Sequence, residues 1–168
     1  MTEISRRRVI AGAAWATPAI LVATSSPPAA ASGGASSTTP PVTGAALTQH
    51  HFGGGSGWDG QPSALTFQLQ YALKYMAGWP ATLVVPTTWV ITLRNAAGAV
   101  VGSATGTAAV SQTAAAQVRT TLSVTATGTY SATYLVTSGS ATVDGVTYKP
   151  DDLMSEQPVT IRVDRLTW

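Results

Sequence analysis

From Ala45 onward, apolar and polar residues alternate with a period of two between short turn signals. The clearest example is the segment Ser63–Leu73, in which every second residue is large and apolar: Leu65, Phe67, Leu69, Tyr71 and Leu73. The residues between them include Thr66, Gln68 and Gln70, which are polar. Because successive side chains of a strand point to opposite faces, this alternation predicts a strand that is buried on one side.

Similar segments follow about every ten residues. A second strand is predicted over 87–93, where Trp89, Ile91 and Leu93 share a face, and its return strand starts at Val100 after the turn at 95–98. The later segments are 118–126, 130–136, 141–143, 146–148 and 159–163. Asp144-Gly145 reads as a hairpin turn, Thr107–Gln117 as a loop or irregular edge strand, and the residues around Met154 as a helical turn. About eight short strands of this kind predict an antiparallel β-sandwich.

Two features resemble the immunoglobulin-like family. The segment Thr127–Tyr134 is similar to the strand that carries the tyrosine corner, with Tyr130 as the corner residue and Ala132 where a disulfide cysteine would stand. Trp89 resembles the core tryptophan of that family. The resemblance implies an all-β, antiparallel immunoglobulin-like β-sandwich over residues 45–168, and it implies nothing about a ligand. The chain departs from the antibody pattern because it has no cysteine.

Residues 1–31 are predicted to be a cleavable signal peptide. The stretch Ser5–Ile10, with Arg6 and Arg7, resembles the twin-arginine export motif, and a general secretory signal is the alternative. A weakly apolar run over 9–23 precedes the small residues Ala29–Ser32, where cleavage is expected. That run contains Pro18 and is too short for a transmembrane anchor. Residues 32–44 are predicted to be a flexible linker, and the mature protein is expected to be extracellular or associated with the cell wall.

Charge and cysteine content exclude several function classes. The absence of cysteine rules out disulfides, thiolate metal sites and a cysteine nucleophile. The net charge of the whole chain is +2, but three of the nine Lys and Arg and one of the seven Asp and Glu precede residue 32, which leaves six of each sign. Because nucleic-acid binding needs a clustered basic surface, nucleic acid is not an expected partner.

Candidate binding residues gather in a glycine-rich segment, interpreted as a loop, from His50 to Pro62. It contains His50, His51, Trp58 and Asp59, and Trp79 is a second aromatic residue beside Gly and Pro. Tryptophan rings in loops stack on sugars or anchor protein interfaces, although they also close the open ends of a sandwich. Adjacent histidines point to opposite faces of a strand and make a poor chelate, so neither a metal nor a cofactor is expected.

No catalytic motif stands in the expected context. The serine of Gly55-Ser56-Gly57 is followed by no predicted helix. Asp144 is explained by a hairpin turn, and Asp151 and Asp152 by a turn or a helix cap. We therefore expect a non-catalytic exported module that binds a cell-envelope component or another surface protein, or serves as structure there. The alternatives are a secreted hydrolase, which would place His50 or His51 beside a carboxylate in a cleft, and a surface-assembly subunit, which would expose sheet edges.

Overall fold

The computed structural model describes residues 42–44, 47–56, 63–74 and 76–163. These residues form strands, turns and bends and no helix. A membrane-spanning helix is therefore absent from the described part of the chain. The strands are β1 (Leu47–Ser56), β2 (Ala64–Leu73), β3 (Val85–Asn95), β4 (Val100–Val110), β5 (Ala116–Ser123), β6 (Gly128–Ser138), β7 (Ala141–Val143), β8 (Val146–Tyr148), β9 (Leu153–Met154) and β10 (Val159–Val163).

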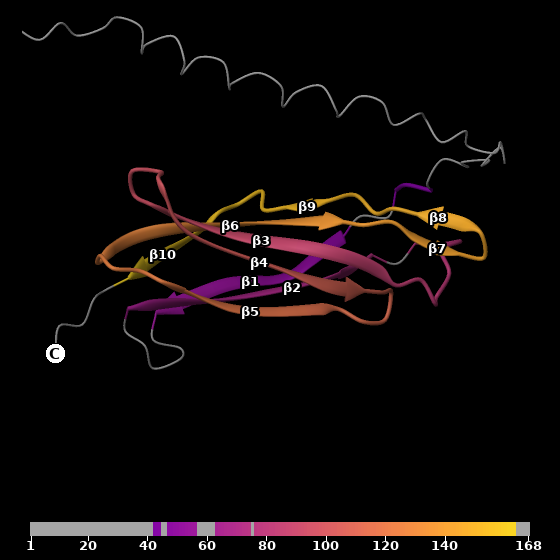
Figure 1. Ribbon diagram of the computed structural model, residues 1–168, viewed down its shortest axis with the longest axis horizontal. Coiled ribbons are helices and arrows are strands. Elements are labelled where there is room, and N and C mark those ends of the chain that lie inside the picture. Colours follow the sequence, from indigo (N-terminus) through magenta and orange to yellow (C-terminus); the bar gives the residue numbers. More distant parts are fainter. Residues whose placement is uncertain (1–41, 45–46, 57–62, 75, 164–168) are drawn as a thin grey trace, which may run out of the picture. The chain divides into compact units, whose positions relative to one another are not determined.

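The strands form two sheets that face each other (Figure 1). One sheet has the order β1-β2-β5, and the other has the order β10-β6-β3-β4 with the short β9 also paired to β6. A separate hairpin joins β7 to β8, and every pair of these strands is antiparallel. The predicted class, an all-β antiparallel sandwich, is therefore confirmed.

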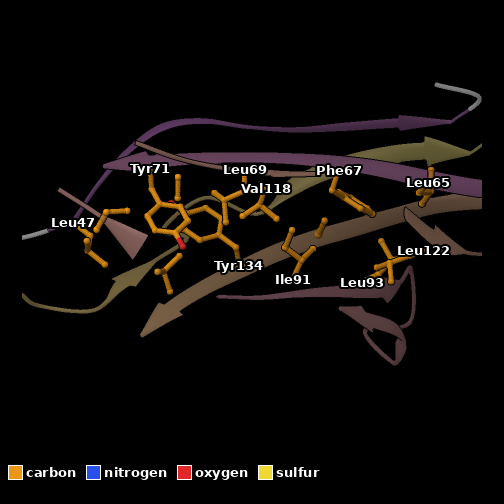
Figure 2. Packing of buried hydrophobic residues seen from close by; sticks show 14 of the residues in the cluster. Leu47, Leu65, Phe67, Leu69, Tyr71, Ile91, Leu93, Val118, Leu122 and Tyr134 are labelled. Atoms are coloured by element: carbon orange, nitrogen blue, oxygen red, sulfur yellow. The ribbon is translucent and has the colours of Figure 1, made fainter. Parts of the chain in front are cut away.

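The core lies between the two sheets and follows from the alternation along their strands. The five large apolar residues of the segment Ser63–Leu73 are at most 3% exposed, as the sequence pattern predicted. Facing them across the sandwich are Ile91 and Leu93 from β3 and Tyr134 from β6, and Figure 2 shows these side chains filling the space between the layers. Burial of large apolar side chains from both sheets is the main force that holds the layers together.

Three tyrosine hydroxyls are satisfied at the boundary of this core. The Tyr71 hydroxyl lies 2.7 Å from the hydroxyl of Thr87 on the opposite sheet. The Tyr134 hydroxyl donates to the side-chain oxygen of Gln49 on β1 over 2.5 Å. Tyr130 donates to the backbone oxygen of Ala126, four residues upstream, over 2.7 Å. Because a buried hydroxyl without a partner is costly, the Tyr71 and Tyr134 bonds, which join the two sheets, favour one packing of the sheets.

Two expectations from the sequence are wrong. The residues around Met154 form strand β9, not a helical turn, because the backbone at 153–154 pairs with β6. Residues 50–56 of the segment expected to be a loop, His50–Pro62, lie in strand β1, and residues 57–62 lie outside the described residues. A Cβ added at Gly54 would lie 2.6 Å from the Phe67 ring and 2.9 Å from Ile161, so this glycine is required by close packing.

Two other positions are refined by the structure. The segment Thr107–Gln117 holds the end of β4, a turn and the start of β5. Trp89 is half-buried and packs against the core, and its ring lies directly over Gly106 of β4, where an added Cβ would be 2.4 Å away. The Asp144-Gly145 turn is confirmed, with both residues at positive φ (51° and 77°) as a two-residue hairpin requires.

Candidate functional site

The outer face of the sheet β1-β2-β5 carries a cluster of polar side chains. We call it the polar face and define it as His51 of β1, Gln68 and Gln70 of β2, and Gln117 and Arg119 of β5. Gln70 pairs with His51 on one side and with Gln117 on the other. Gln68 pairs with Gly53 and Arg119 in the next row. These residues, with Leu69 and Val118, line a shallow hollow on the sheet.

A β-bulge places His51 on this face. Gln49 pairs with Tyr71, whereas His51 pairs with Gln70, so the register shifts by one residue between them. Without the shift, Gln49 and His51 would point to the same side of the strand, because side chains alternate with a period of two. The extra residue, His50, lets Gln49 reach the inner Tyr134 hydroxyl while His51 turns outward.

Gly53 provides space for the His51 side chain. A Cβ added at Gly53 would lie 3.0 Å from Nε2 of His51, so the imidazole lies along β1 over this glycine. The ring is thereby held beside the row that contains Gln68 and Arg119. An alanine at position 53 would require the imidazole to shift by a few tenths of an ångström.

The chemistry of the polar face is that of hydrogen bonding. Each glutamine amide offers two donors and an acceptor, the imidazole offers one of each when neutral, and the guanidinium is a fixed positive charge. None of the described residues that line this hollow is a carboxylate. Among the residues that the structure describes, no group of three or more His, Cys, Asp or Glu could hold a metal ion.

The other predicted site residues lie elsewhere. His50 is exposed at the bulge of β1. Trp79 is half-buried and packs against the core, with its ring centroid 5.0 Å from that of Tyr148. Its backbone oxygen accepts a hydrogen bond from the side chain of Gln112. Trp58, Asp59 and the export residues Arg6 and Arg7 lie outside the described residues. The structure thus brings His51 together with four residues that sequence reasoning did not select. The polar alternation along β2 indicated Gln68 and Gln70, whereas Gln117 and Arg119 lie on β5 and meet them through strand pairing.

A second hollow lies where β1 approaches β9 and β10, and it contains Tyr134, whose pKa is raised. Its lining includes Phe52, Tyr134, Met154 and Glu156. Burial raises the pKa of the Tyr134 hydroxyl above its ordinary value, and the negative charge of Glu156 raises it further. The ring of Phe52 meets Tyr134 edge to face at 4.9 Å. Through its hydrogen bond to Gln49, Tyr134 joins the two sheets at this hollow. We therefore attribute the residues of this hollow to the packing between the sheets and not to a binding site.

Comparison with known proteins adds no assignment: no protein-family model matches the chain, and no curated protein is significantly similar to it.

Proposed function

We propose that this protein is a non-catalytic, exported binding module of the cell envelope, and that its polar face binds a glycan. The observation that carries the proposal is the arrangement of the three glutamines beside His51 and Arg119 in two adjacent rows. No carboxylate from the described part of the chain stands beside His51 in its hollow, which favours binding over the hydrolase alternative.

The ligand class follows from hydrogen-bonding capacity. A glycan presents many hydroxyl groups, each able to donate and accept, and amide side chains match them because they do both. Arg119 adds a positive charge suited to a carboxylate or phosphate on the glycan. The residues within each row lie on directly paired antiparallel strands, and the two rows are adjacent along those strands. Their side chains are therefore close enough to contact one extended chain of sugars.

We also propose that the sandwich is of the immunoglobulin-like type. The orders β1-β2-β5 and β10-β6-β3-β4 correspond to the strand orders A-B-E and G-F-C-C′ of that family. Trp89 then lies on the C-type strand and Tyr130 on the F-type strand, as the resemblance implies. The bond from Tyr130 to Ala126 and the complete burial of Ala132, two residues later, support the same assignment.

The test is binding of the purified protein to isolated cell-wall glycans, measured by co-sedimentation and then by calorimetry on soluble fragments. Gln68→Ala combined with Gln117→Ala should weaken binding at least tenfold, since about 1 kcal/mol is lost for each hydrogen bond removed. Gln157→Ala, an exposed glutamine outside the polar face, is the matched control and should bind as the wild type does. Equal binding by the double variant and the control would place the ligand elsewhere. Failure of the wild type to bind any glycan would reject this ligand class.

A further inference from the structure

Strand β4 is an open edge of the larger sheet. It ends the order β10-β6-β3-β4, and among the described residues no other strand pairs with its far side. β4 is eleven residues long and carries neither a charged residue nor a proline. An edge of this kind is a template for pairing with another strand, and proteins usually protect such edges with charges, prolines, bulges or short length.

The other described edges of the two sheets have such protection. β1 contains the bulge between Gln49 and His51, β5 carries Arg119, and β10 has five residues including Arg162. β4 has a register shift only at its beginning, opposite Leu93 and Arg94, and its pairing with β3 is regular from Gly102 to Val110. The lack of protection on β4 is therefore specific to this strand.

Two side-chain bonds show which backbone groups face the open side. The Thr105 hydroxyl donates to the backbone oxygen of Trp89, and the Thr87 hydroxyl donates to that of Ala108. Trp89 is opposite Gly106 and Thr87 is opposite Ala108, so the even-numbered residues of β4 direct their backbone groups toward β3. The odd-numbered residues Ser103, Thr105 and Thr107 direct their N–H and C=O groups to the open side.

The side chains of β4 are complementary to a second copy of the same strand. We propose that two copies of this chain pair antiparallel through β4, with a two-fold axis at Thr105, to form one continuous sheet. In this register Thr105 faces Thr105 of the partner subunit, and Ser103 faces Thr107 of the partner subunit. Hydroxyl residues thus meet hydroxyl residues on the outer face, a favourable type of cross-strand pair.

The inner face of β4 fits the same register. Gly102 is then opposite Ala108 of the partner subunit, and Ala104 is opposite Gly106 of the partner subunit, so small residues meet small residues. No like charges are brought together, because the strand has none. A two-fold axis makes one patch complementary to itself, which is the common geometry of homodimers. Such an exposed edge is also what the surface-assembly alternative required.

The test uses sedimentation velocity of the purified whole chain over a concentration series. We expect a concentration-dependent dimer in the wild type. Thr105→Lys places two like charges opposite each other across the axis and should weaken the dimer at least tenfold. Thr137→Lys, an exposed threonine on the outer face of β6, is the matched control and should dimerise as the wild type does. A wild type that stays monomeric up to millimolar concentration, or a dimer unaffected by Thr105→Lys, overturns the proposal.

Cross-linking tests the register. Because the chain has no cysteine, Thr105→Cys introduces a single thiol that should form an intermolecular disulfide under mild oxidation, as Cα atoms of opposed antiparallel residues lie within disulfide range. Thr137→Cys is the control and should remain reduced. Equal cross-linking of the two variants rejects pairing at Thr105. The polar face lies on the other sheet, so glycan binding and dimer formation can fail independently.

Discussion

At the scale of single residues, the hydroxyl and the ring of Tyr130 stabilise the fold in different ways. The hydroxyl bonds to Ala126 while the ring packs in the core, so the two roles can be separated by substitution. Tyr130→Phe keeps the ring and should lower the free energy of unfolding by about 1 to 2 kcal/mol, and Tyr130→Ala by about 3 to 5 kcal/mol. Urea unfolding measures both free energies.

Tyr148→Phe is the control, because its hydroxyl makes no hydrogen bond to a described residue. If the Tyr130→Phe variant unfolds like the wild type, a stabilising role for this bond is rejected.

The buried tyrosines also predict a dependence on pH. Burial raises the pKa of the Tyr71 hydroxyl, an effect that its bond to Thr87 partly offsets, and burial also raises that of Tyr134. Below about pH 10 both tyrosines are protonated whether the chain is folded or unfolded, so they cause no change in stability. Above it, the unfolded chain releases these protons first, and stability should fall as pH rises. The double variant Tyr71→Phe, Tyr134→Phe should show a smaller fall above about pH 10. An unchanged slope would contradict this explanation.

At the scale of the element, two neighbouring glycines of β1 have different roles: Gly54 allows core packing, and Gly53 leaves space for the His51 side chain. Gly54→Ala would force a methyl group into the Phe67 ring, and we expect a loss of about 1 to 3 kcal/mol in urea unfolding. Gly53→Ala meets only the end of the His51 side chain, which can move aside, so stability should change by less than about 1 kcal/mol. Gly53→Ala should nevertheless weaken glycan binding, because the imidazole of His51 must shift from its position on the polar face. Equal stability of the two variants would show that Gly54 is not required by packing.

At the scale of the whole molecule, export is the property to be tested first. The adjacent Arg6 and Arg7 resemble the twin-arginine motif, which is sensitive to the identity of both residues. If the chain uses that route, Arg6→Lys with Arg7→Lys should leave the precursor in the cytoplasm, measured by fractionation and immunoblotting. Arg8→Lys, the neighbouring arginine, is the control. Normal secretion of the double variant would reject the twin-arginine route and leave a general secretory signal as the explanation.

The buried faces of β2, β3 and β6 follow from the amino-acid sequence alone, because their alternation depends only on the period of a strand. The turn at Asp144-Gly145 followed from local backbone preferences in the same way. The site, in contrast, depends on how the strands are paired in the folded chain. Gln68 is far from Gln117 and Arg119 in the chain and meets them through strand pairing. His51 reaches them through a bulge that alternation cannot predict. Gly53 and Gly54 are explained by contacts with the His51 ring and with Phe67 and Ile161, which exist only after folding.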